Sequence, residues 1–126
     1  MSAHDVNDDE FLVARFYAGA LPLALDAAHL TLLHDDALDA IDPLPSLGVA
    51  RPASAETLRC GRFHFDGRHT SLRLGRGVQL VTVRRAQLFA LPPLLEDLDR
   101  RGVLGILHCG DACVALLDAR LLCAAR

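Results

Sequence analysis

The chain has 126 residues, of which 52% are hydrophobic and 23% charged, with a formal net charge of −3. The length suits one compact domain or two small lobes that share a core, and the hydrophobic content excludes a disordered chain. No apolar run approaches the roughly 20 residues of a membrane-spanning helix. The net charge disfavours a nucleic-acid partner. The polar, acidic start lacks the features of a signal peptide, so we expect a cytoplasmic protein.

The basic residues and the cysteines carry little catalytic signal. All 13 basic residues are arginine, whose planar guanidinium suits carboxylate pairing and protein interfaces better than the lysine ammonium does. Without an export signal the four cysteines are expected to be reduced and to pack as small hydrophobic residues. They are Cys60, Cys109, Cys113 and Cys123.

The first third of the chain predicts a tail, a hairpin and a helix. Residues 1–10 are expected to be a disordered tail. Two apolar runs, 11–17 and 20–25, flank a turn-capable Gly19 and predict a β-hairpin. Pro22 cannot donate to a strand ladder, so the second strand should lie at a sheet edge or end early.

A short helix is predicted after this hairpin. Asp26 is a suitable N-cap for residues 27–33, and the apolar spacing allows the helix to continue to Ile41. A group of aspartates would form its solvated face, without the glycine and closing glutamate of a calcium loop. These residues are Asp35, Asp36, Asp39 and Asp42.

The remainder of the chain predicts paired strands joined by tight turns. After a proline-rich loop at 42–54, Asp66-Gly67 is a strong two-residue hairpin signal. The predicted strands are 58–65, 68–74, 78–83, 87–91, 103–109 and 112–117. Residues 94–98 are expected to form a helical turn or an irregular crossing, and 121–123 a strand or a helical turn. Some eight to ten short strands favour small antiparallel barrels or a sandwich.

The stretch GILHCGDACVALLD at 105–118 places one histidine and two cysteines close together. If Gly110-Asp111 is a two-residue turn, His108 pairs with Cys113 and Cys109 with Ala112. Because neighbouring side chains on a strand point to opposite faces, Cys109 then faces away from the other two. The geometry therefore favours a hairpin over a metal clamp.

A metal- or thiol-dependent protein remains an alternative. It would use Cys60, Cys109, Cys113 and His108, with Cys113 and His108 as a possible thiolate pair. However, Cys113 has apolar neighbours and no evident oxyanion hole. No serine elbow, phosphate loop or dinucleotide fingerprint is present. We therefore predict no catalytic residues, no metal ligands and no cofactor.

Three stretches match one known pattern in their order and spacing. Residues 61–67 read Gly-Arg-Phe-His-Phe-Asp-Gly and precede a return strand. They resemble the Gly-x-Ile-Asn-Leu-Arg-Gly turn of CheW-like domains, the coupling domains of bacterial chemotaxis. The stretch 105–118 is similar to the last hairpin of that family, and the start at 11–25 with the predicted helix is similar to its first elements. The resemblance covers roughly residues 11 to 122.

The resemblance implies a mainly β fold of two intertwined, five-stranded, SH3-like β-barrels with one short helix, in a domain that spans residues 11–126. It implies a non-enzymatic adaptor that needs no cofactor. The implied partners are the regulatory domain of a CheA-type histidine kinase and the cytoplasmic tip of a chemoreceptor. The expected role is the coupling of the two in chemosensory signal transduction.

The hairpin around the turn supplies the candidate protein-binding residues, Arg62, Asp66, Arg68 and Arg73. Asp66 stands where the family has arginine, and Arg73 stands near a position where the family has aspartate. These departures suggest a swapped Asp66–Arg73 pair and a divergent adaptor. Phe63 and Phe65 share one strand face and are expected in the core, whereas His64 and His69 are expected to be exposed.

Overall fold

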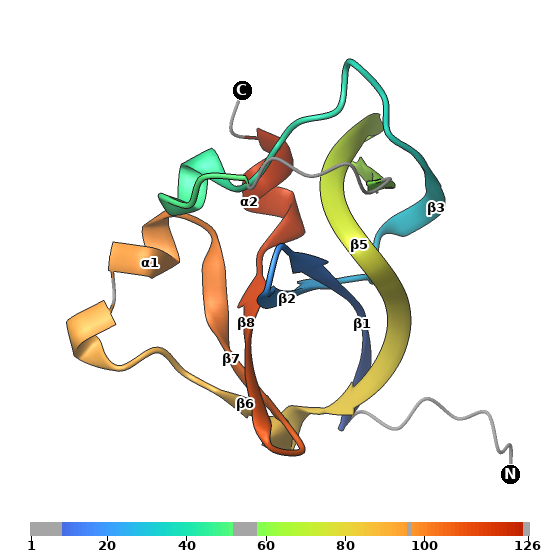
Figure 1. Ribbon diagram of the computed structural model, residues 1–126. Helices are drawn as coiled ribbons and strands as arrows, with labels where there is room; N and C mark the ends of the chain where they lie inside the picture. Colours follow the sequence, from blue (N-terminus) through green and yellow to red (C-terminus); the bar gives the residue numbers. More distant parts are fainter. Residues whose placement is uncertain (1–8, 52–57, 96, 125–126) are drawn as a thin grey trace, which may run out of the picture.

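The structure is a computed structural model that describes residues 9–51, 58–95 and 97–124. It confirms a mainly β fold. The strands form one sheet in the order β3-β4-β5-β1-β2-β8-β7-β6, and the sheet is not closed because β3 and β6 lie at its two ends (Figure 1). The strands are β1 (Glu10–Ala18), β2 (Leu21–Asp26), β3 (Leu30–Asp35), β4 (Arg59–Phe65), β5 (Arg68–Arg84), β6 (Leu88–Phe89), β7 (Val103–Cys109) and β8 (Ala112–Leu117).

Short helical segments connect and end the strands. The expected turn at 94–98 is helical on both sides of residue 96, which lies outside the described residues, and the expected element near 121–123 is the helix α2. The segments are the 3₁₀ turns η1 (Pro45–Leu47), η2 (Arg85–Gln87) and η3 (Pro93–Leu95), and the helices α1 (Asp97–Arg100) and α2 (Ala119–Ala124). None of the described helices has the length and apolar character to cross a bilayer. The predicted tail lies largely outside the described residues, and β1 begins at Glu10.

The helix predicted after Asp26 is wrong, because this segment forms a turn and then strand β3. The Asp26 carboxylate does accept a hydrogen bond, from the backbone N–H of Ala28 at 2.9 Å, but it closes a turn. The apolar spacing of the segment fits either element, and pairing with β4 decides in favour of the strand. The aspartates that follow therefore do not form a helix face.

The predicted edge position of Pro22 is also wrong, because β2 lies between β1 and β8. Pro22 pairs with Tyr17 in the β1–β2 hairpin. The parallel ladder with β8 begins only at Leu23. In a hairpin closed by a two-residue turn, this pair is not hydrogen-bonded, so the missing N–H would have pointed toward β8. Because that ladder starts one residue later, the proline leaves no ladder bond unmade.

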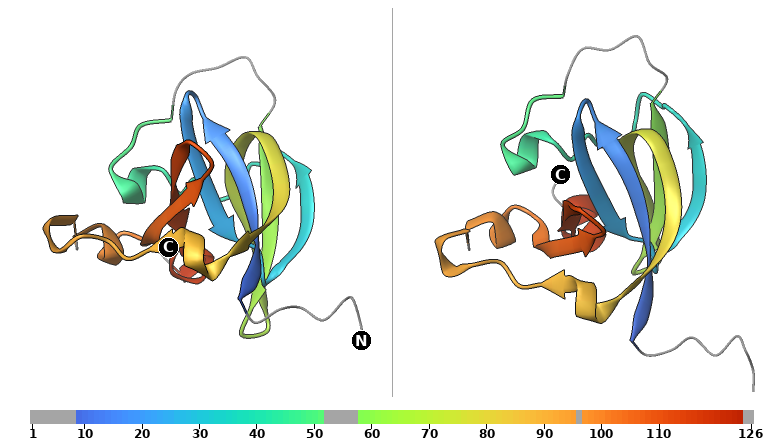
Figure 2. Two further views of the ribbon diagram at one scale, coloured as in Figure 1. Left: turned by 90° about the horizontal axis from the view of Figure 1, so that it is seen from below. Right: turned by 60° about the horizontal axis from the view of Figure 1, so that its bottom comes forward.

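The strands predicted at 68–74 and 78–83 are one continuous strand, β5. Its first half pairs with β4, and from Arg76 onward it pairs with β1. Gly75 lies at the change of partner, where a Cβ atom would clash with the Tyr17 carbonyl oxygen, and Gly77 has a positive φ of 64°. These glycines thus allow the strand to bend across two neighbours. Figure 2 shows the resulting curved layer, with the segment from β6 to α1 projecting away from it.

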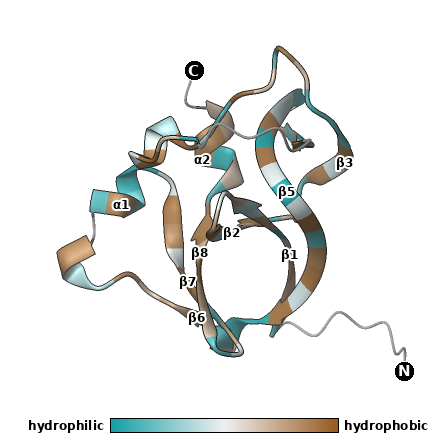
Figure 3. Cartoon of the chain, in the orientation of Figure 1, coloured by the Kyte–Doolittle hydropathy of each residue, from teal (hydrophilic) through white to brown (hydrophobic). Residues whose placement is uncertain are grey.

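The core consists of two hydrophobic clusters on opposite sides of the central strands. On β1, Phe16 belongs to the first cluster and Val13 to the second. On β8, Leu117 belongs to the first and Val114 to the second. Strands buried on both faces need nearly continuous apolar sequence, which β7 and β8 show in Figure 3, whereas β5 alternates between polar and apolar residues.

Candidate protein-binding surface

The β4–β5 hairpin carries all four candidate residues, and its turn forms as the sequence predicts. Asp66 and Gly67 have φ values of 51° and 77°, the two positive angles of a tight I′ hairpin turn. The side chain of Phe63 is fully buried, and its ring stacks on that of Phe65 with centroids 6.2 Å apart. The prediction that these two rings face the core is confirmed for Phe63, while Phe65 is partly exposed.

The register divides the candidates between two surfaces. Arg62 pairs with Ser71, two residues before Arg73 on β5, so these two arginines lie on the outer face of the hairpin. Arg68 pairs with Phe65 and therefore lies on the opposite face, next to the Asp66 turn. The four residues thus do not form one continuous rim.

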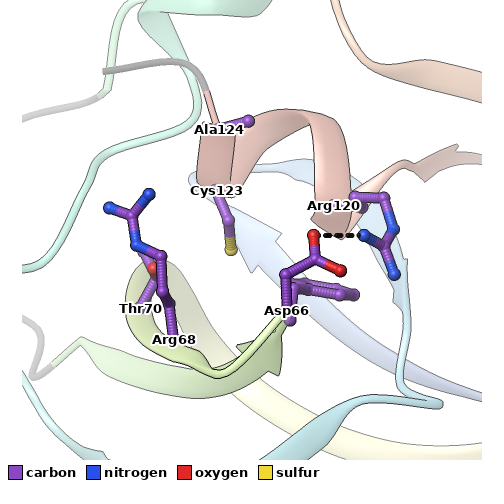
Figure 4. Close-up of a pocket in the computed structure, with 7 residues that line it drawn as sticks. Asp66, Arg68, Thr70, Arg120, Cys123 and Ala124 are labelled. Atoms are coloured by element: carbon purple, nitrogen blue, oxygen red, sulfur yellow. Dashed lines mark hydrogen bonds and ion pairs between the residues drawn. The ribbon is translucent and has the colours of Figure 1, made fainter.

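The hairpin turn and helix α2 enclose a small cleft (Figure 4). Asp66 forms an ion pair with Arg120 of α2, with 2.8 Å between Nη1 and Oδ2. The Arg120 guanidinium also lies 4.7 Å from the centre of the Phe65 ring. The ion-pair side chains are 54% and 79% exposed, so the pair contributes at most about 1 kcal/mol. The cleft has a volume of about 130 Å³ and is lined by Phe65, Asp66, Arg68, Thr70, Arg120, Cys123 and Ala124.

Arg73 is held by Asp36, not by Asp66, so the predicted swapped pair is wrong. Arg73 Nε donates to Asp36 Oδ1 at 2.8 Å, and its Nη2 donates to the Ala37 carbonyl. The hydrogen bond between Arg73 and Asp36 is the main reason why the pKa of Asp36 is lowered, and it raises the pKa of Arg73. The buried Cys60 thiol donates to the same carboxylate at 3.5 Å. Arg73, on β5, therefore holds the segment after β3 against the sheet.

Among solved structures, the chain matches the crystal structure of the scaffolding protein TtCheW from Thermoanaerobacter tengcongensis, with a TM-score of 0.72. The match covers 89% of this chain and 91% of that chain, at 14% sequence identity. The fold is CheW-like. No family model matches the sequence, and no curated protein matches it. The resemblance seen in the sequence is thus confirmed at the level of the fold.

Two of the candidate protein-binding residues carry a guanidinium group that pairs with no described side chain. Within the described residues, the guanidinium groups of Arg62 and Arg68 form no ion pair and no hydrogen bond. Figure 4 shows the Arg68 side chain directed away from the Asp66–Arg120 pair. Both residues are exposed. They are therefore the arginines of the hairpin that can pair with a carboxylate of another molecule without breaking an internal contact.

Sequence reasoning missed Arg120, the residue that fixes the turn to the C-terminal helix. It lies 54 positions after Asp66, and no local motif marks it. Two sequence features together could have pointed to it. They are the aspartate at position 66, where the family has arginine, and an arginine in the last element of the chain. That signal requires the tertiary fold, because only the fold places α2 beside the hairpin.

The cysteines and His108 do not gather at one point in the described part of the chain. The predicted pairs His108–Cys113 and Cys109–Ala112 are confirmed, so Cys109 faces away from the other two. Cys60 lies on β4, which β5, β1 and β2 separate from β8. Within the described ranges, no group of three or more His, Cys, Asp or Glu side chains could hold a metal ion. The metal- or thiol-dependent alternative is therefore not favoured.

The thiols differ in their environment. All four cysteines are free; Cys60 and Cys123 are buried, as expected, whereas Cys109 is half-buried and Cys113 is exposed. Burial raises the pKa of the Cys123 thiol to about 11, and the nearby Asp118 carboxylate adds to the effect. Because the thiolate is the nucleophile, Cys123 is unsuited to react in the cleft that it lines.

Proposed function

We propose that the protein is a non-enzymatic adaptor in bacterial chemosensory signal transduction. In this proposal it couples the cytoplasmic tip of a chemoreceptor to the regulatory domain of a CheA-type histidine kinase through protein–protein contacts. The match to a scaffolding protein over 89% of this chain carries the proposal. The order of the Gly61–Gly67 turn and the last hairpin in the sequence supports it independently. The domain would span residues 11–126 and act in the cytoplasm.

The proposal includes the finer architecture of two intertwined five-stranded barrels. Two hydrophobic clusters lie on opposite faces of β1, β2 and β8, as two lobes built around shared strands require. Strand β5 adds Leu72 and Leu74 to the first cluster and Val83 to the second. With eight described strands, two barrels of five would have to share strands.

The hairpin is the proposed binding region, with Arg62 and Arg73 on its outer face and Asp66 and Arg68 at its turn and opposite face. Arg62 and Arg68 supply charge that no partner among the described residues neutralises. A partner carboxylate would add a charge-assisted, bidentate hydrogen bond at either position. Asp66 and Arg73 would act mainly by holding the turn and the loop after β3 in place.

Binding to a purified kinase regulatory domain and to a receptor-tip fragment tests the proposal. We expect the wild-type protein to bind both in biolayer interferometry. Arg68→Glu should weaken binding to the partner that contacts its face of the hairpin about tenfold, which is about 1.4 kcal/mol. It should leave the unfolding midpoint and the solubility unchanged because the residue is exposed. Asp66→Arg should also change the affinity, since it alters the charge of the same turn.

Arg100→Glu is the matched control, since Arg100 is an exposed arginine of α1 that contacts no carboxylate within the described residues. This variant should bind like the wild type. The proposal is wrong if the wild type binds neither partner at concentrations up to about 100 µM. If it binds but all three variants behave alike, the adaptor role stands and the hairpin is not the interface.

A further inference from the structure

The outer face of the β4–β5 hairpin brings two imidazoles together. His64 and His69 face each other across the strands, one pair removed from the tight turn. With a two-residue turn this is a non-hydrogen-bonded pair, the kind in which side chains approach most closely. The ring centroids are 4.4 Å apart and the ring planes differ by 15°. Both residues are exposed, as the sequence predicts.

The other described histidines are engaged in different contacts. Both ring nitrogens of His34 make hydrogen bonds, to the Asp35 carbonyl oxygen at 2.7 Å and the Ser71 hydroxyl at 2.9 Å. His29 lies against the Phe65 ring, and His108 against Phe89. Within the described residues, the ring contacts thus show one pair of imidazoles side by side.

We propose that His64 and His69 together bind one divalent transition-metal ion, such as Zn²⁺, Ni²⁺ or Cu²⁺. Neutral imidazole nitrogen is a preferred ligand of these ions. An imidazole nitrogen lies about 2.0–2.1 Å from bound Zn²⁺ and roughly 1.1 Å from its own ring centre, so two imidazoles on one ion hold their centres roughly 4.5–5.2 Å apart. The observed 4.4 Å separation lies just below this range.

Rotation of both rings completes the geometry. In the stacked arrangement the ring planes are nearly parallel, whereas each bound ring must point a nitrogen at the ion. Rotation about χ2 achieves this, and that torsion is soft in histidine. Both side chains are exposed, so each ring borders on solvent.

The nearest described cation affects the choice of metal ion. Desolvation, followed by the nearby Arg62 guanidinium and His64, lowers the pKa of His69. The Arg62 charge also repels a cation, so the site favours ions that bind imidazole strongly over Mg²⁺ or Ca²⁺.

The site is open, because this chain supplies two ligands and no larger ligand group is present in the described part of the chain. Water, or a donor from a bound molecule, would fill the other positions. The inference stands on the register and spacing of two side chains and does not depend on the proposed adaptor function.

Titration of the tag-free protein with ZnCl₂, followed by calorimetry and by NMR of the histidine rings, tests the inference. We expect saturable binding of one ion per chain, with the ring signals of His64 and His69 shifting together. His64→Ala and His69→Ala should each weaken binding about tenfold or more, because even the loss of a supporting contact to a ligand costs that much. His108→Ala is the matched control, an exposed histidine on another hairpin, and should leave binding unchanged.

Three results would overturn the inference. They are no saturable binding, binding that survives both substitutions, and a loss confined to one of the two variants, which would indicate a single ligand. Circular dichroism of each variant confirms that the fold is retained, as exposure of both side chains leads us to expect.

Discussion

The substitution Gly75→Ala tests the crossing of β5 over its two partner strands. A Cβ atom at Gly75 would overlap the Tyr17 carbonyl oxygen, and it would lie 3.0 Å from the Tyr17 carbonyl carbon and 3.2 Å from Cδ2 of Phe16. The first contact is more than about 1 Å shorter than van der Waals contact allows. It involves backbone atoms, so no side-chain rotation relieves it. The strands β1 and β5 must therefore separate where Tyr17 pairs with Arg76.

The expected cost is at the upper end of the range for overpacked positions, about 3 kcal/mol or more. Urea unfolding monitored by circular dichroism measures it, since the strands form the bulk of the signal. Gly110→Ala is the control: it lies at a φ of 62° with open space around the added Cβ, so it should cost only about 1–2 kcal/mol of backbone strain. A Gly75→Ala protein within about 1 kcal/mol of the wild type would refute the close approach of these strands.

Two further predictions concern the Arg73–Asp36 ion pair and the thiols. Arg73→Gln should destabilise the fold at neutral pH, and the difference in unfolding free energy from wild type should shrink in acid. The reason is that Arg73 lowers the pKa of Asp36 from its ordinary 3.8. The stabilisation by this ion pair is therefore complete above pH 3.8 and is lost as the pH falls through the lower pKa of Asp36 in the folded state. Urea unfolding from about pH 7 to about pH 2 measures this, and a constant gap would contradict it. Iodoacetamide at about pH 8 should modify the exposed Cys113 in the native protein and leave the buried Cys123 intact. Peptide mass mapping decides, and equal labelling of the two would contradict the burial of Cys123.

The hairpins could be predicted because their signals are local. Asp66-Gly67 and Gly110-Asp111 are turn pairs flanked by strand-forming residues, and both turns form at the predicted positions. A two-residue turn fixes the register of the strands that it joins. The pairing of His108 with Cys113 followed from that rule alone, and so did the rejection of a metal clamp in the last hairpin.

The failed predictions depend on distant partners. Residues 27–41 carry apolar spacing that a helix and a strand can both use, and pairing with β4 selects the strand. Pro22 is tolerated inside the sheet because of where β8 begins to pair. The sequence also shows no sign that Arg120 will reach Asp66, or that Asp36 will reach Arg73, since each contact spans more than thirty residues.

The distribution of ion pairs has a consequence for recognition. Three of the four aspartates predicted to form a solvated face instead hold arginines, in the pairs Asp35–Arg59, Asp36–Arg73 and Asp42–Arg51. A partner that competed for these arginines would have to break an internal contact and leave a carboxylate without its cation.

Arg62 and Arg68 impose no such cost, because their guanidinium groups are uncommitted within the described residues. They lie on opposite faces of one hairpin, so a single small contact cannot engage both. Two partners could therefore use the hairpin at once, one on each face. In that case the Arg68→Glu variant should lose binding to one partner and retain binding to the other. Loss of both partners in that single variant would instead indicate one shared interface at the cleft beside α2.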